Sequence, residues 1–89
     1  MTTIEQLEAA LDPLSPSHLT IQDDSALHAG HAGNTGGGHY TVTIVSKQFE
    51  GLSLLKRHRL VYDAAAVLMK QKIHALSIRA KTPQEAQTQ

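Results

Sequence analysis

Residues 40–45 of the chain, Tyr-Thr-Val-Thr-Ile-Val, alternate apolar and polar side chains. A period of two is typical of a strand that buries one face, because successive side chains point to opposite sides of a sheet. We therefore expect Tyr40, Val42 and Ile44 to share the face that meets the core. This strand is the centre of the predicted fold, with further elements on both sides of it in the sequence.

The residues before this strand predict a helix and a second strand. A Thr-x-x-Glu/Gln capping box opens a helical pattern over residues 3–12, and Pro13 ends it. Leu19-Thr-Ile-Gln-Asp23 alternates again and predicts a strand that pairs with residues 40–45 as a hairpin. The connection, residues 24–38, is longer than the usual hairpin loop of about two to five residues, and long loops are often functional.

The residues after the central strand predict a second helix and a third strand. Ser53 can cap a helix over residues 55–71, whose apolar positions form one wide stripe. The stripe consists of Leu60, Val61, Ala64, Ala65, Val67 and Leu68. Residues 73–80 alternate once more, which places His74 on the face of Leu76. A strand–helix–strand connection of this length implies a right-handed crossover, so the last two strands are expected to be parallel.

Together these elements predict an α+β fold of order α-β-β-α-β, with helices on one face of a three-stranded mixed sheet. The length of 89 residues suits a single domain, expected over residues 1–83 and followed by a polar, flexible tail at 84–89. Once the helices pack on the sheet, no sizeable apolar stripe is expected to stay exposed, so we expect the isolated chain to be a monomer.

Several classes of protein are disfavoured by what the sequence lacks. It contains no cysteine, so it can supply no disulfide, thiolate ligand or cysteine nucleophile. No stretch has the pattern of a signal peptide or the length of a membrane span, so we expect a cytoplasmic protein without membrane contact. An enzyme is not expected either, because no nucleophile elbow, Walker loop or HExxH spacing is present.

The charged residues are unevenly distributed, although the net charge is zero. All eight basic residues lie within 47–81, where only Glu50 and Asp63 are acidic. Such an excess favours an anionic partner, but a solvated helix face gives the same pattern, so both interpretations stay open. The residues that could contact nucleic-acid phosphates are Lys56, Arg57, Arg59, Lys70 and Lys72.

Residues 28–40 concentrate three histidines and five glycines within thirteen residues. Imidazole is a common metal ligand, yet a solvated loop can have the same composition, so composition alone does not decide between the two. His39 falls on the strand face opposite Tyr40 and is predicted to be a surface or sheet-packing residue.

Three stretches of the sequence resemble the BolA family. They are DDSALHAGHAG at 23–33, GGGHYTVTIVSKQFEGLSLLKRHRLVY at 36–62 and IHALSIRAKTP at 73–83, and the resemblance covers roughly residues 17–83. It implies a fold like the type II KH domain, which agrees with the element order above. It also implies a monothiol glutaredoxin as partner and a 2Fe–2S cluster shared with that glutaredoxin and glutathione, with no cofactor in the isolated chain.

The resemblance further implies which residues of this chain would bind the cluster. His74, in HALSI, matches the family's histidine at the start of the last strand. His28 matches the loop ligand, and its neighbour His31 is the alternative. Many family members carry an acidic residue and Thr where this chain has Gly37-Gly38, which loosens the far end of the loop and leaves the choice of loop ligand open.

Two functions therefore compete. The first is an iron–sulfur adaptor that binds a monothiol glutaredoxin. The alternative is a DNA-binding regulator of stress response and cell morphology, a role to which some family members are linked. A KH domain that grips nucleic acid uses a Gly-X-X-Gly loop between its helices, and residues 49–59 contain only Gly51, which weakens the alternative.

Overall fold

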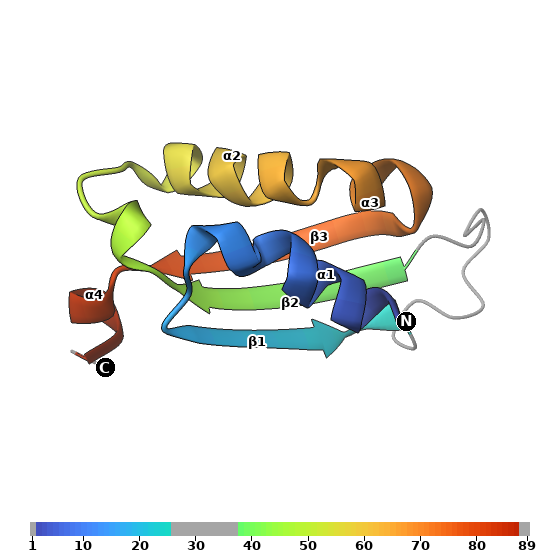
Figure 1. Ribbon diagram of the computed structural model, residues 1–89, viewed down its shortest axis with the longest axis horizontal. Helices are drawn as coiled ribbons and strands as arrows, with labels where there is room; N and C mark the ends of the chain where they lie inside the picture. The colour runs from blue at the N-terminus through green and yellow to red at the C-terminus, as the bar shows by residue number, and fades with distance from the viewer. Residues whose placement is uncertain (1, 26–37, 88–89) are drawn as a thin grey trace.

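The computed structural model describes residues 2–25 and 38–87. Its sheet contains β1 (His18–Asp23), β2 (Gly38–Val45) and β3 (Ile73–Lys81), in the order β1-β2-β3. β1 pairs antiparallel with β2, and β3 pairs parallel with β2. The predicted hairpin and parallel crossover are both present, with β2 in the middle of the sheet (Figure 1).

The helices α1, α2 and α3 lie on one face of this sheet, with α1 against β1 and with α2 and α3 along β3, and α4 lies at the end of β3 (Figure 1). Their bounds are α1 Thr3–Leu11, α2 Leu54–Ala64, α3 Ala66–Gln71 and α4 Pro83–Gln87, with 3₁₀ turns η1 Asp12–Leu14 and η3 Lys47–Phe49. The predicted capping box is present, because Thr2 Oγ1 accepts from the Glu5 N–H and the Glu5 carboxylate accepts from the Thr2 N–H. Among the described residues, no helix is long and apolar enough to cross a membrane.

The helix predicted over 55–71 is two helices, because the backbone leaves helical geometry at Ala65, where φ is −96° and ψ is 10°. No Gly or Pro marks this break in the sequence, so apolar periodicity could not reveal it. Val61 and Leu68 are buried as predicted, whereas Val67 is 65% exposed, so its assignment to the buried stripe was wrong.

The core is aliphatic and surrounds a single phenylalanine. Tyr40, Val42 and Ile44 share the buried face of β2, as their alternation predicted. The most completely buried apolar side chains, all at 0% exposure, are Leu7, Leu11, Val42, Ile44, Phe49 and Val61. They come from α1, β2, η3 and α2, so one core connects the helices to the sheet.

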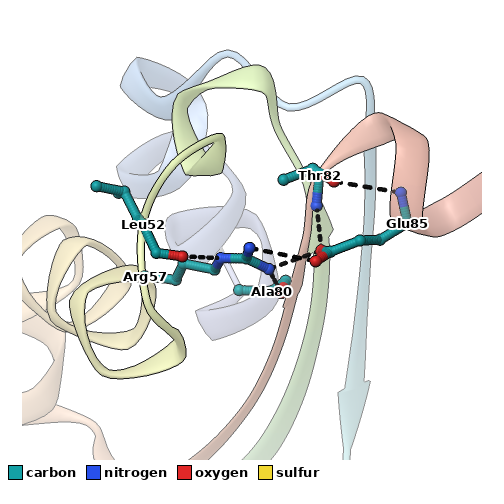
Figure 2. A network of polar contacts seen from close by, with 5 residues as sticks. All are labelled: Leu52, Arg57, Ala80, Thr82 and Glu85. Carbon is teal, nitrogen blue, oxygen red and sulfur yellow. Dashed lines mark hydrogen bonds and ion pairs between the residues drawn. The ribbon is translucent and has the colours of Figure 1, made fainter.

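A buried arginine connects α2, the end of β3 and α4 (Figure 2). Arg57 donates from Nε to the Leu52 carbonyl, at 3.0 Å, and from Nη1 to the Ala80 carbonyl, at 3.1 Å. Its two terminal nitrogens also donate to the Glu85 carboxylate, at 2.7 and 3.2 Å. Glu85 in turn forms a capping box with Thr82, at 2.8 and 3.2 Å. Residues 84–87, from the segment 84–89 expected to be a flexible tail, belong with Pro83 to the helix α4.

The ionisation of Glu85 should make stability depend on pH in a defined window. The hydrogen bond from Arg57, and next that from the Thr82 N–H, lower the pKa of Glu85 from 4.5 to about 2. A carboxylate whose pKa falls on folding stabilises the fold while it is ionised, so this contribution is complete above pH 4.5 and lost as the pH falls toward about 2. We expect the free energy of unfolding, from urea titrations, to fall more steeply across this window in the wild type than in Glu85→Gln.

Two other carboxyl groups serve as an internal control for that comparison. Hydrogen bonds from Thr2 lower the pKa of Glu5, and hydrogen bonds from Ser25 lower the pKa of Asp23. Both groups titrate in the wild type and in Glu85→Gln alike, so their effect cancels in the difference. Equal slopes for the two proteins would show that Glu85 is not a source of acid sensitivity.

Candidate metal centre

His74 lies at the start of β3 with its side chain exposed. The register of β2 and β3 pairs Gly38 with Ile73 and then His39 with Ala75, so His74 is the extra residue of a β-bulge. The bulge turns Ile73, at 4% exposure, into the core and leaves His74 outside. The expectation that His74 shares the buried face of Leu76 was therefore wrong, because strict alternation does not continue through a bulge.

His39, on β2, is the neighbour that the sequence interpretation missed. Its ring centroid lies 5.2 Å from that of His74, and the two ring planes are tilted by 47°. His39 occupies the face opposite Tyr40, as predicted, but it faces another imidazole there. Parallel strands begin at the same edge of a sheet, so a histidine near the start of each strand was the signal that could have revealed the pair.

The chain that enters the segment between β1 and β2 is tied to the backbone of His39. The Asp24 N–H donates to the His39 carbonyl at 2.7 Å, and the His39 N–H donates to Ser25 Oγ at 3.0 Å. Thr41 Oγ1 donates to the Asp24 carboxylate, and the Ser25 N–H donates to the Asp23 carboxylate at 2.8 Å. The end of β1 is thus fixed beside the histidine pair.

Gly38, on the other side of that segment, belongs to the sheet. Its N–H donates to the Lys72 carbonyl at 3.0 Å, and it pairs with Ile73. A Cβ atom at position 38 would collide with the ring of Tyr40, so the buried ring occupies the space that a threonine side chain would need. The Tyr40 ring fills the space beside Gly38. Residue 38 is paired within the sheet, whereas the sequence suggested a loosened end of the loop there.

The two loop histidines named from the sequence, His28 and His31, fall within residues 26–37, outside the part of the chain that the structure describes. Their role as ligands stays a prediction. In residues 2–25 and 38–87, no three His, Asp or Glu side chains gather closely enough to hold a metal ion. Those residues offer a pair of imidazoles, so any metal held there needs further ligands from elsewhere.

The basic residues considered for nucleic-acid binding do not form one patch. Lys56 and Arg59 are exposed on α2, and Lys70 and Lys72 are exposed at the end of α3. At about 1.5 Å of rise per helical residue, the two groups lie roughly 20 Å apart along the helical layer. Arg57 is buried and bonded to Glu85, so in this fold it is not available to a phosphate, contrary to the expectation. This distribution does not favour the DNA-binding alternative.

The fold defines a small α+β domain whose sheet carries the half-buried His39 beside the exposed His74, and comparison with known proteins identifies its family. The family model for BolA-like protein matches residues 8–85. Protein BOLA1, chloroplastic, from Arabidopsis thaliana is 48% identical over 86 residues, which cover 92% of this chain and 52% of that protein. The solved structure of BolA1 from Arabidopsis thaliana matches with a TM-score of 0.83 and 41% identity, covering 96% of both chains. This chain belongs to the BolA-like family.

A second relative shows the same kind of domain within a longer protein. SufE-like protein 1, chloroplastic/mitochondrial, from Arabidopsis thaliana is 48% identical over 87 residues, covering 91% of this chain and 23% of that protein. The chain thus spans about a quarter to about half of these two relatives. Their names refer to organelles, and the cytoplasmic location expected from the sequence stays a prediction.

Proposed function

We propose that this chain is a BolA-like adaptor that docks on a monothiol glutaredoxin and helps to bind a 2Fe–2S cluster through histidines. His74 is the first ligand, and His28 is the second, with His31 as the alternative. Because the chain contains no cysteine, the thiolates come from the glutaredoxin and from glutathione. The observation that carries the proposal is the exposed ring of His74, which the β-bulge turns away from the core.

The exposure of His74 supports a role as ligand rather than as a core residue. An imidazole buried among aliphatic side chains would use its nitrogen atoms in internal hydrogen bonds and could not reach a partner protein. Here the exposed ring lies at the sheet edge where the chain between β1 and β2 begins. Bulges are frequent where a strand turns a functional side chain in a new direction. The bulge at His74 turns this side chain away from the core.

The loop histidine is within reach of this edge by chain length alone. Residue 28 follows Ser25 by three positions, a span of at most about 10 Å in extended chain. Ser25 Oγ accepts from the His39 N–H at 3.0 Å, and the His39 ring lies 5.2 Å from that of His74. Residue 31 follows by six positions and is in reach as well, so both candidates satisfy the chain-length requirement.

A combination of imidazole ligands from this chain and thiolate ligands from the partner suits a cluster that is passed between proteins. Imidazole is a good iron ligand, and a cluster with imidazole in place of thiolate has a higher reduction potential. This chain would contribute the orientation of the His74 side chain and the fixed end of β1, while the sulfur ligands would stay with the partner. An adaptor with no thiolate of its own can release its share of the site without breaking an iron–thiolate bond.

The test is visible circular dichroism on mixing the chain with its cluster-loaded monothiol glutaredoxin. We expect the wild-type chain to change the spectrum and His74→Ala to abolish that change. Of the loop variants, His28→Ala should weaken the change more than His31→Ala. His18→Ala is the matched control, because His18 is an exposed histidine on β1 whose ring is bonded to Thr20, at 2.9 Å, and it should behave as the wild type.

Two outcomes would contradict the proposed function. One is a spectrum that the wild-type chain leaves unaltered at saturating concentration. The other is a His74→Ala spectrum as large as that of the wild type, which would assign His74 a structural role only.

A further inference from the structure

A pocket lies at the end of the sheet away from the histidine pair, where β1 begins and where β2 and β3 end beside α4 (Figure 1). Its volume is about 450 Å³, within the roughly 300–1,000 Å³ of pockets that hold small molecules. Lys81 is seven positions beyond His74 on β3, or roughly 23 Å at about 3.3 Å per residue, so the pocket is separate from the site of the proposed function. The walls of this α4 pocket include His18, Thr43, Val45, Lys81, Pro83 and Ala86.

The pairing of the strands places polar and apolar groups of the α4 pocket on one face of the sheet. Val45 pairs with His18 on one side and with Lys81 on the other, so these three residues form a row across the sheet. Thr43 lies two positions before Val45 on β2 and therefore on the same face. This face is opposite to the one that meets the core, so it is the face that α1, α2 and α3 leave uncovered.

One part of the α4 pocket is apolar. Val45 is only 6% exposed, although it does not belong to the core that connects the helices to the sheet. Pro83 and Ala86, on α4, line the same pocket and are half-buried. The hydrocarbon body of a ligand would gain binding energy here, because apolar area on both sides is removed from water.

The other part of the α4 pocket is polar and positively charged. Lys81 is half-buried, and none of the described residues that line the pocket is acidic. Within residues 2–25 and 38–87, the Lys81 ammonium group and the Thr43 hydroxyl have no hydrogen-bond or ion-pair partner. A partly buried ammonium group favours an anion, because an anion replaces the hydrogen bonds that burial takes away and neutralises the charge.

We propose that the α4 pocket binds a small organic carboxylate. The carboxylate accepts from the Lys81 ammonium group and the Thr43 hydroxyl, and the apolar body of the ligand lies against Val45, Pro83 and Ala86. A singly charged carboxylate matches the pocket better than a doubly charged phosphate ester, because Lys81 is the only Lys or Arg among the described residues that line it. This site goes beyond the proposed function and does not depend on it.

The first experiment titrates the isolated full-length chain with 3-phenylpropionate and follows the backbone amide resonances by NMR. We expect saturable shifts at Thr43, Lys81 and Ala86. The alcohol 3-phenylpropan-1-ol lacks the charge, and acetate lacks the apolar body, so each should bind at least about fivefold more weakly. Equal binding of the alcohol, or shifts centred on residues outside the pocket, would overturn the inference.

Lys81→Met tests the contact with the carboxylate, and Arg79→Met is its matched control. Arg79 lies two positions earlier on β3, is exposed and is not among the residues that line the pocket, so both variants lose one positive charge but only one loses the contact. Lys81→Met should weaken binding at least about fivefold, less than a fully buried charged contact would give, because Lys81 is half-buried. Arg79→Met should weaken it no more than about twofold. The bond from the Ser46 N–H to the Lys81 carbonyl, at 3.0 Å, uses the backbone and remains in the variant.

A second pair of variants tests the place of the apolar body without changing the charge. Ala86→Trp puts an indole ring into the pocket from α4 and should weaken the binding of 3-phenylpropionate at least about fivefold, because the ligand loses apolar contacts. Gln84→Trp adds the same ring at an exposed position of α4 that is not among the pocket residues, so it should change the affinity no more than about twofold. Lys81→Met binding as tightly as Arg79→Met, or Ala86→Trp as tightly as Gln84→Trp, would contradict the proposed site.

Discussion

Replacing Arg57 with methionine should lower the free energy of unfolding by about 2–3 kcal/mol, because it leaves backbone carbonyl acceptors inside the protein without a donor. The side chain of Arg57 is 10% exposed and donates to the Leu52 and Ala80 carbonyls as well as to Glu85. Methionine keeps much of the aliphatic stem but none of the donors, so the buried Ala80 bond is lost. Urea unfolding measures the change, and each 1 kcal/mol corresponds to roughly 4–8 °C in Tm for a domain of this size.

Arg59→Met is the matched control for this prediction. Arg59 lies two positions further along α2 and is exposed, so its replacement should alter the free energy of unfolding by no more than about 0.5 kcal/mol. The double variant Arg57→Met/Glu85→Gln should be less destabilised than the sum of the two single variants, because the two residues share one contact. If Arg57→Met lowered the free energy of unfolding no more than Arg59→Met, the hydrogen bonds of Arg57 would contribute little to stability. Arg57 would then again be a candidate for contact with a phosphate.

The arginine network and the histidine pair lie at opposite ends of β3. Ala80, which accepts from Arg57, is six residues beyond His74, or roughly 20 Å at about 3.3 Å per residue of strand. Substitutions this far apart usually act independently. Arg57→Met should therefore lower the free energy of unfolding without reducing the change in visible circular dichroism on mixing with the glutaredoxin. His74→Ala should abolish that change without lowering the free energy of unfolding.

Elements whose apolar residues recur at regular intervals were predictable from the sequence. Their first and last residues in the structure differ from the predicted ones by only a few positions. The alternation at 40–45 identified the central strand and its buried face, and the Thr-x-x-Glu box identified the start of α1. These features are local, since side chains within one element determine them. Membership of the BolA family was also predictable, because HALSI and FEGLSLLKRHRLVY are themselves local patterns.

The features that the sequence could not reveal depend on residues far apart in the chain. Arg57 looked like an exposed cation because its partner, Glu85, is 28 residues away in a segment expected to be frayed. His74 looked buried because a bulge is a property of the pairing between two strands and leaves no mark on either sequence. His39 was assigned to the surface because its neighbour, His74, is reached only through the parallel crossover. Each of these three errors concerns pairing between elements, whereas the break at Ala65 and the helix α4 are differences in the elements themselves.

Replacing Phe49 with alanine should be at least as damaging as the loss of Arg57, with an expected cost of about 3–5 kcal/mol. Phe49 is the only phenylalanine of the chain and is 0% exposed, at the end of the η3 turn between β2 and α2. A small domain has a stability of only about 5–15 kcal/mol, so this variant should lie close to unfolding at room temperature.

Leu54→Ala controls for the loss of an apolar side chain nearby, at the start of α2. Leu54 is 64% exposed, so its truncation should change the free energy of unfolding by no more than about 0.5 kcal/mol. Phe49→Leu should fall between the two, because leucine refills part of the cavity. A Phe49→Ala variant with the stability of Leu54→Ala would mean that aliphatic contacts between the helices and the sheet suffice. The expected order of stability, Phe49→Ala below Phe49→Leu below Leu54→Ala, would show that the aromatic ring holds the connection between β2 and α2 against the core.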